Sequence, residues 1–124
     1  MSEKPQVNVP EGDPTGKQLG IVDIIDGDGE QAQAGQIAEV HYVWVSWNSG
    51  NEFDASWNRG QTFSFKLGGG QVISGWDQGV VGMRIGGRRE LTIPPALGYG
   101  SAGAGGVIGP NEHLIFVVEL GSLR

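Results

Sequence analysis

The chain has no cysteine, few basic residues and no long apolar run, and each of these absences excludes a class of protein. Without a thiol among its 124 residues, disulfides, cysteine nucleophiles and thiolate metal sites are excluded. No stretch approaches the roughly 20 apolar residues that a membrane span needs, and no apolar run of a signal peptide follows residues 1–5. We therefore expect a location in the reducing cytoplasm.

The charge distribution argues against nucleic acid as a partner. The formal net charge is −6, and most of the excess of acidic residues lies within residues 1–35. Binding to phosphates needs clustered basic side chains, and Arg84, Arg88 and Arg89 are too few. We interpret these arginines as a solvated turn and strand face. Two histidines without cysteine make a poor metal site, so we expect neither a metal nor another cofactor.

Glycine is the residue in excess, with 23 copies where a usual share of about 7% would give far fewer. The glycines are not periodic, which excludes collagen-like and solenoid repeats. They cluster at turn positions, as in β-rich folds. Residues 1–18 contain three prolines and no apolar periodicity, which predicts a flexible acidic N-terminal arm. We expect residues 19–124 to form a single domain.

Several segments have the apolar pattern of β-strands. In the longest of them, Val40, Tyr42 and Trp44 share one face by the two-residue alternation. The last segment is apolar on both faces for most of its length, which predicts a central strand that is covered on each side. The predicted strands are residues 21–25, 37–47, 62–67, 89–93 and 114–120.

Only one segment favours a helix. Ile73, Trp76 and Val80 recur there at spacings of three and four. Ser74 is suited to cap the start of this helix, and Gly82 suits the left-handed residue beyond its end. A helix of about eight or nine residues does not persist alone, so tertiary packing must hold it. The sequence therefore predicts an α+β fold, a twisted antiparallel sheet wrapped over one short helix.

The aromatic residues gather in one part of the chain, because all ten lie within residues 42–116. Most must belong to the core of so small a domain. Phe53 directly precedes Asp54 after a turn, which places a carboxylate beside a large ring. Tyr99 stands between two glycines at the start of residues 98–109, where six of twelve residues are glycine. Such a segment either only connects two strands or is moulded around a ligand, and the residue pattern leaves both readings open.

In their order and spacing, these motifs resemble the FKBP-type peptidyl-prolyl cis–trans isomerases. The resemblance covers about residues 19–123 and implies a twisted five- to six-stranded antiparallel sheet wrapped around one short helix. The motifs that carry it are Phe53-Asp54-Ala55-Ser56, LGxxxVIxGW ending at Trp76, GVxxMxxG from Gly79 to Gly86, and Gly98-Tyr99-Gly100.

The resemblance implies an aromatic pocket that receives the ring of a proline. In the family, the position of Trp76 is the pocket floor, and those of Tyr42, Phe53 and Phe116 are its walls. The ligand-binding residues that the resemblance implies are Tyr42, Phe53, Asp54, Phe63, Val72, Ile73, Trp76, Tyr99, Val107, Ile108 and Phe116.

Three polar groups complete the site that the resemblance implies. The Ile73 backbone N–H and the Tyr99 hydroxyl donate hydrogen bonds to ligand carbonyls. The Asp54 carboxylate, held by Tyr42 and Arg59, accepts a hydroxyl or faces the carbonyl of the twisting amide. The catalytic residues implied in this way are Phe53, Asp54, Trp76 and Tyr99.

The function implied by the resemblance is acceleration of rotation about X–Pro bonds in proteins, which assists folding. We expect a monomer that acts on proline-containing polypeptides and that macrolides of the rapamycin and tacrolimus type inhibit. Two other uses of the same pocket stay open, a non-catalytic module that recognises proline motifs and a carrier of an apolar small ligand. By residue pattern alone, Trp76 could be an ordinary core residue, and Asp54 could only brace a turn by pairing with Arg59.

The sequence departs from the family pattern without removing a pocket residue, and each departure could change substrate preference. The departures are Ala104 in place of a histidine that several members carry at the tip of the Gly-rich segment, Trp57 and Asn58 before Arg59, the small pair Leu97-Gly98 before Tyr99, and one extra residue between Tyr42 and Phe53 that adds Trp44 and Trp47 nearby.

Overall fold

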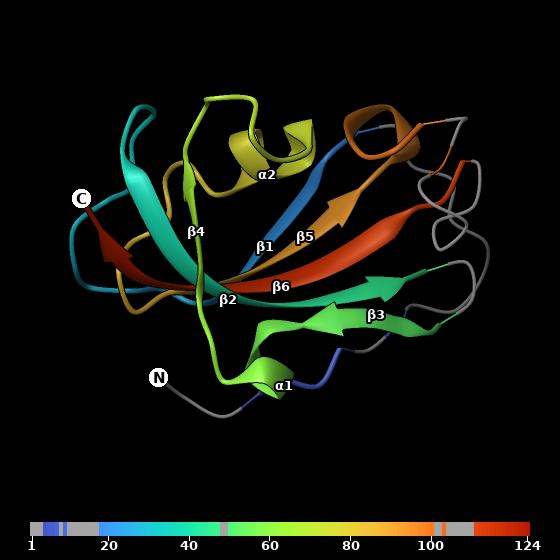
Figure 1. Cartoon of the computed structure of the whole chain (residues 1–124), viewed down its shortest axis with the longest axis horizontal. Coiled ribbons are helices and arrows are strands. Elements are labelled where there is room, and N and C mark those ends of the chain that lie inside the picture. Colours follow the sequence, from blue (N-terminus) through green and yellow to red (C-terminus); the bar gives the residue numbers. More distant parts are fainter. Residues whose placement is uncertain (1–3, 8, 10–17, 48–49, 101–102, 104–110) are drawn as a thin grey trace.

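A six-stranded antiparallel sheet and three short helical segments make up the described part of the computed structural model, which is residues 4–7, 9, 18–47, 50–100, 103 and 111–124. Figure 1 shows the sheet curving beneath the second helix. No helix in this part of the chain is long and apolar enough to cross a membrane. The elements are β1 (Gly20–Ile25), β2 (Ile37–Ser46), β3 (Glu52–Ala55), α1 (Ser56–Arg59), β4 (Phe63–Lys66), α2 (Ser74–Gly79), β5 (Arg88–Ile93), the 3₁₀ turn η1 (Pro95–Leu97) and β6 (Leu114–Leu123).

The sheet has the strand order β1-β5-β6-β2-β3, and β4 also pairs with β2. Strands β3 and β4 occupy successive stretches of one edge of β2, since Val43 lies opposite Ala55 and Val40 lies opposite Phe63. Strand β6 is central, as its apolar pattern predicts, and every residue from Leu114 to Leu120 is buried. The predicted α+β architecture is confirmed.

Helix α2 lies against the concave face of the sheet, which we call the inner face. It spans six residues rather than the predicted eight or nine, because it already ends at Gly79. The expectation that Ser74 caps the helix was wrong, since Ile73 is the N-cap and no side chain makes a cap hydrogen bond. Gly82 does adopt a positive φ of 94°.

Two glycines of α2 allow the helix to lie directly on β5. A Cβ atom at Gly75 would lie 2.6 Å from the Ile93 side chain, and one at Gly79 would lie 2.6 Å from Leu91. Real Cβ atoms do not approach other atoms so closely, so a larger residue would push the helix off the sheet. The main core fills the space between α2 and the inner face, and it includes Val40, Tyr42, Phe65, Leu67, Trp76, Val80, Met83, Phe116 and Val118.

Three short elements are absent from the sequence-based prediction, namely β3, α1 and η1. Each has three or four residues, too few for a hydrophobic period to show. The prediction that only one segment is helical was therefore wrong. Helix α1 ends at Arg59 and is capped by Gly60, whose φ of 64° places it in the left-handed region. The turn η1 begins at a proline, which is pre-organised for a helical start.

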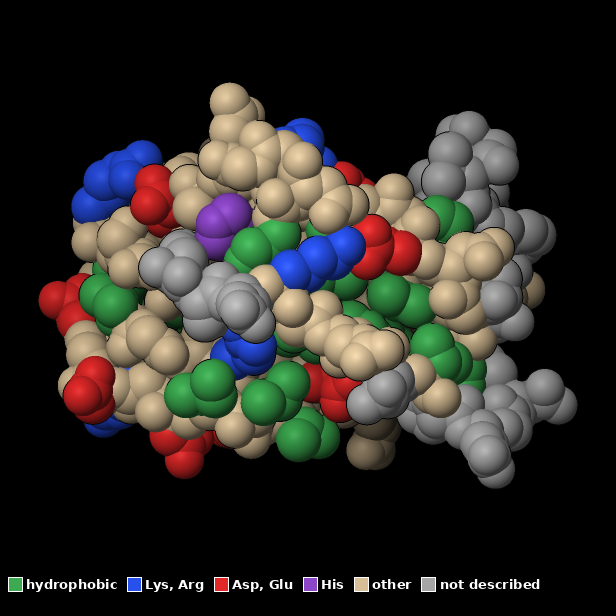
Figure 2. All heavy atoms as spheres, turned by 90° about the horizontal axis from the view of Figure 1, so that it is seen from below, with side chains coloured by type: hydrophobic (Ala, Val, Ile, Leu, Met, Phe, Trp, Pro, Cys, Tyr) green, Lys and Arg blue, Asp and Glu red, His purple; other side chains and the backbone are tan. Residues whose placement is uncertain are grey.

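The described part of the N-terminal arm lies against the opposite face of the sheet, which we call the outer face (Figure 1). The Lys4 Nζ atom lies 3.0 Å from a carboxylate oxygen of Glu52 and 3.0 Å from the side-chain oxygen of Asn58. Val7, Val9 and Trp57 pack against the outer cluster of Val43, Val45 and Ala55. In the view onto this side of the molecule, apolar side chains reach the surface among basic and acidic ones (Figure 2).

Candidate active site

An aromatic pocket of about 220 Å³ lies on the inner face, beside the start of α2. Strands from distant parts of the chain supply its walls, and the segment leading into α2 supplies its remaining side. The lining residues are Tyr42 and Trp44 from β2, Phe63 from β4, Phe116 from β6, Gln71, Val72, Ile73 and Trp76 from the segment around α2, and Tyr99 from the turn after η1.

Trp76 is the most buried ring on the helical side of this pocket, with 4% of its surface exposed. Its ring meets Tyr42 edge-on at a centroid distance of 5.4 Å and Phe116 at 5.3 Å. Phe63 lies edge-on to it at 6.0 Å. Edge-to-face contacts are a preferred geometry of aromatic pairs, so three neighbours fix the orientation of this indole.

The structure places the remaining predicted ligand-binding residues in three different ways. Phe53 does not line the cavity itself and instead packs edge-on against Trp44 at 5.5 Å. Asp54 also lies outside the lining but one hydrogen bond away from Tyr42, which is part of it. Val107 and Ile108 fall outside the described residues, and so does Ala104.

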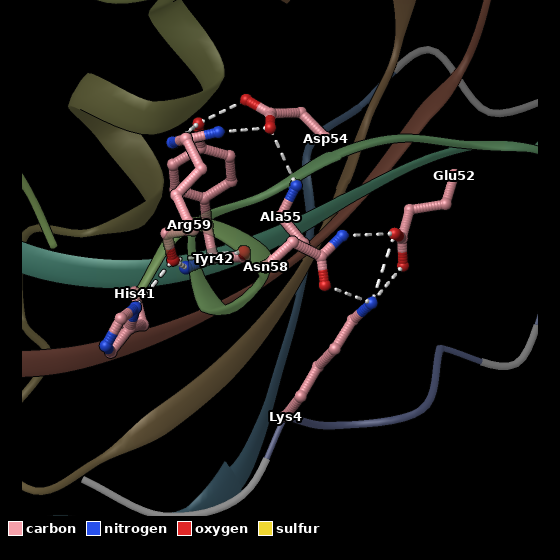
Figure 3. A network of polar contacts seen from close by, with 9 residues as sticks. Lys4, His41, Tyr42, Glu52, Asp54, Ala55, Asn58 and Arg59 are labelled. Carbon is pink, nitrogen blue, oxygen red and sulfur yellow. Dashed lines mark hydrogen bonds and ion pairs between the residues drawn. The ribbon is translucent and has the colours of Figure 1, made fainter. Parts of the chain in front are cut away.

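The Asp54 carboxylate is held by three groups (Figure 3). The Tyr42 hydroxyl donates to Oδ2 at 2.5 Å, the Arg59 guanidinium pairs with Oδ1, and the Ala55 N–H donates to Oδ1 at 2.9 Å. Arg59 also donates to the Tyr42 hydroxyl oxygen at 2.9 Å, which closes a triangle of polar contacts. Burial, together with the hydrogen bond to Asp54, raises the pKa of Tyr42, so that its hydroxyl keeps its proton.

A second polar group fixes the backbone of Tyr42 from the outer face. The N–H of Tyr42 donates to the Ser56 Oγ atom at 2.7 Å, and the same oxygen lies 2.7 Å from Nδ1 of His41. Because Ser56 follows directly on β3, this contact ties the strand of Asp54 to the strand of Tyr42. Burial lowers the pKa of His41 from its ordinary 6.5, so the neutral ring is favoured in this contact.

Several hydrogen-bond donors of the pocket lining have no partner among the described residues, including the indole N–H groups of Trp44 and Trp76. The Ile73 N–H donates to no described group, although its carbonyl accepts from Trp76 at 3.0 Å. Tyr99 lies in the turn that the Gly100 N–H closes by donating to Pro95 at 2.8 Å, and its hydroxyl has no described partner. Burial raises the pKa of Tyr99, so this hydroxyl stays protonated and able to donate.

The family of this chain follows from comparison with known proteins. A family model described as FKBP-type peptidyl-prolyl cis-trans isomerase matches residues 28–121. The chain belongs to this family. The FK506-binding protein of Streptomyces anulatus is similar to it, with 61% identity over 119 residues that make up 95% of each chain.

Two further relatives of this FKBP-type isomerase cover nearly the same region. The probable FK506-binding protein of Corynebacterium glutamicum is 48% identical over 118 residues, which are 95% of this chain and 97% of that protein. The crystal structure of AtFKBP13 superposes with a TM-score of 0.78 and 39% identity, over 86% of this chain and 93% of that one. The resemblance noted in the sequence is confirmed, and with it the class of enzyme, peptidyl-prolyl cis–trans isomerase.

Two residues that line the pocket of this FKBP-type isomerase are missing from the sequence-based set of site residues. Trp44 could have been found, because the alternation along β2 places it on the face of Tyr42. Gln71 has no such signal, and its side-chain oxygen accepts a hydrogen bond from the Lys66 N–H at 3.0 Å. Among the described residues, no three acidic or histidine side chains come together as metal ligands would.

Proposed function

We propose that this FKBP-type isomerase accelerates rotation about X–Pro bonds by receiving the proline ring on Trp76 within the aromatic pocket. The observation that carries this function is a pocket lined mostly by rings, in which the Ile73 N–H and the Tyr99 hydroxyl have no described hydrogen-bond partner. Such a cavity combines apolar burial with two fixed points for the carbonyls of an extended peptide.

The chemistry requires no reactive group, because rotation neither makes nor breaks a bond. Its barrier of roughly 18–20 kcal/mol arises from the loss of amide resonance. A catalyst must bind the twisted amide more strongly than the planar one. The planar amide has the larger charge separation, so transfer from water into an apolar pocket disfavours it relative to the twisted state.

The polar groups of the site hold the chain on either side of the rotating bond. Donation from Ile73 and Tyr99 fixes the flanking carbonyls, while the imide carbonyl turns past the carboxylate of Asp54. Tyr42 and Arg59 hold that carboxylate in place. An acceleration of a thousandfold needs only about 4 kcal/mol, which a few oriented contacts and burial can supply.

We further propose that the natural substrates are proline-containing polypeptides during folding, and that tacrolimus- and rapamycin-type macrolides compete for the same pocket. The identity of 61% with an FK506-binding protein supports the second point. We also propose a monomer in the cytoplasm, with residues 1–18 as an arm outside the catalytic domain. Sedimentation of the purified chain and cell fractionation test the monomer and the location.

The test of function is exchange NMR of a short peptide that contains one Leu-Pro bond. The wild type should accelerate cis–trans exchange, and tacrolimus should abolish the acceleration. Tyr99→Phe should lower kcat/KM about fivefold, because one neutral hydrogen bond is lost, and Asp54→Asn should also lower it. The exposed Ser64→Ala on β4 serves as the control and should leave the rate unchanged.

Absence of acceleration at micromolar enzyme would overturn the proposed function. The alternatives would then be a module that recognises proline motifs and a carrier of an apolar ligand. Native mass spectrometry of the purified protein would detect a co-purified ligand in the second case.

A further inference from the structure

Trp44 lines the pocket and contacts three other aromatic rings of the site. Its indole stacks on Phe116 at a centroid distance of 5.3 Å and an interplanar angle of 22°. It stacks on Tyr99 at 5.8 Å and 16°, and it meets Phe53 edge-on at 5.5 Å. The indole therefore joins residues of β3 and β6 to the turn that carries Tyr99.

Tyr99 also packs against the main core, but it has few other contacts that fix the orientation of its ring. It lies between two glycines, which carry no side chain, and Gly100 has a φ of 64°. Among the described residues, Trp44 is the only aromatic side chain in ring contact with Tyr99. The hydroxyl has no described hydrogen-bond partner that would fix the ring from its other end.

We propose that Trp44 is the positioning residue for Tyr99, whose ring it holds so that the hydroxyl donates into the pocket. This role rests on the proposed function, because it concerns the donor that binds the peptide carbonyl. Trp44 acts from a regular strand, β2, and so transmits the rigidity of the sheet to a donor in a glycine-rich turn. Offset stacking of near-parallel rings contributes energy beyond burial alone, which suits it to this purpose.

The contact uses the face of the indole and not its N–H group. The Trp44 Nε1 atom is buried and has no hydrogen-bond partner among the described residues. A phenylalanine in its place would keep a flat ring on β2 while removing a donor that has nothing to bind. Trp44→Phe is therefore the conservative variant, and Trp44→Leu removes the stacking surface.

The decisive experiment is a double-mutant cycle measured as kcat/KM on the Leu-Pro peptide. Trp44→Leu should lower kcat/KM about fivefold, as loss of the Tyr99 hydrogen bond does, and Trp44→Phe should stay within about twofold of the wild type. In a Tyr99→Phe background, Trp44→Leu should lower the rate by no more than about twofold further, because the hydroxyl it positions is already absent.

Trp47→Leu is the matched control for the tryptophan substitution. This residue follows β2 directly and contacts His113 edge-on at 6.3 Å, outside the lining of the pocket. Its replacement should change neither the rate nor the titration of Tyr99. Additive losses in the cycle, or an equal loss with Trp47→Leu, would overturn the positioning role.

The titration of Tyr99 gives a readout that does not depend on catalysis. The chain has only two tyrosines, so a titration of the wild type and of Tyr99→Phe assigns each of them. In Trp44→Leu the pKa of Tyr99 should return toward 10.0, since burial raises it in the wild type, whereas Trp44→Phe should keep it raised. An unchanged pKa in Trp44→Leu would contradict the contact.

Two further observations separate the possible failures. An inactive wild type would overturn the proposed function, while the pKa comparison would still decide whether Trp44 holds Tyr99. If Trp44→Leu does not fold, nuclear Overhauser effects between the two rings in the wild type and the rate of Trp44→Phe decide the matter. Absence of those effects, or a loss in Trp44→Phe as large as that expected for Trp44→Leu, would overturn the inference.

Discussion

The two faces of the sheet place different chemistry on neighbouring residues of one strand. On the inner face, the rings of Tyr42 and Trp44 pack against other rings. Some hydrogen-bond donors of the pocket lining there have no described partner. On the outer face, His41 and Glu119 are polar yet only 8% and 5% exposed. The inner face therefore leaves donors open toward the pocket, whereas polar side chains of the outer face contact one another.

Tyr42 connects the two faces. Its ring belongs to the inner pocket, while its backbone N–H is bound by Ser56, which also contacts His41 on the outer face. Beyond them, Glu119 lies opposite His41 across the strands and pairs with Arg88 at 3.3 Å. The position of the Tyr42 ring in the pocket therefore depends on polar contacts on the outer face of the sheet. The three changes below break this arrangement from one face or the other.

Removal of the Trp76 ring from the inner face should lower the stability of the fold the most. Trp76→Ala should lower the free energy of unfolding by about 3–5 kcal/mol, because it leaves a cavity beneath three rings. The matched change on the outer face is Trp57→Ala, whose ring stacks on His41 at 4.7 Å but is only half-buried. Urea unfolding should show a clearly smaller loss for Trp57→Ala, and equal losses would remove the distinction between the faces.

Removal of the Ser56 hydroxyl on the outer face should lower the stability of the fold by a moderate amount. Ser56→Ala leaves the Tyr42 N–H and a nitrogen of His41 buried without their partner, which should cost about 1–3 kcal/mol. The exposed Ser64→Ala should stay within about 0.5 kcal/mol of the wild type. Equal urea midpoints for the two serine variants would show that the contact behind Tyr42 contributes nothing.

The smallest expected effect is the contribution of His41 to the pH dependence of stability. Burial lowers the pKa of His41 below 6.5 in the folded chain, although attraction to Glu119 opposes the shift. The unfolded chain then binds more protons just below 6.5, so this residue reduces stability as the pH falls from neutral through that value. His41→Gln should remove part of the loss of stability between neutral and mildly acidic pH in urea titrations. If stability depended on pH in the same way in His41→Gln and in the wild type, this role of His41 would be contradicted.

Every strand except β3 could be predicted from the sequence, including the four-residue β4, whereas α1 and η1 could not. Strands β2, β5 and β6 have enough alternating or continuous apolar residues to be located within a few residues of their observed ends. Strand β3 has only four residues, two of them acidic, and depends on pairing with β2. The cap of α2 was misassigned because a serine at a helix start predicts a side-chain bond that the local backbone does not form.

The site was predictable where its residues belong to motifs of the family. Tyr42, Trp76 and Tyr99 line one pocket, although 57 positions separate the first from the last in the sequence. Trp44 lies on the face that alternation predicts, but nothing in the sequence shows that its ring meets Tyr99. That contact depends on where η1 places the residues that follow it, and tertiary packing determines this position.

The central position of β6 has a consequence for synthesis of the protein. Strands β5 and β2 do not pair with each other and are joined only through residues 114–123. While the ribosome still holds that segment, two long strand edges have no partner, and such edges attract other chains. The domain should therefore acquire its sheet and its pocket together, in a late step that follows release of β6.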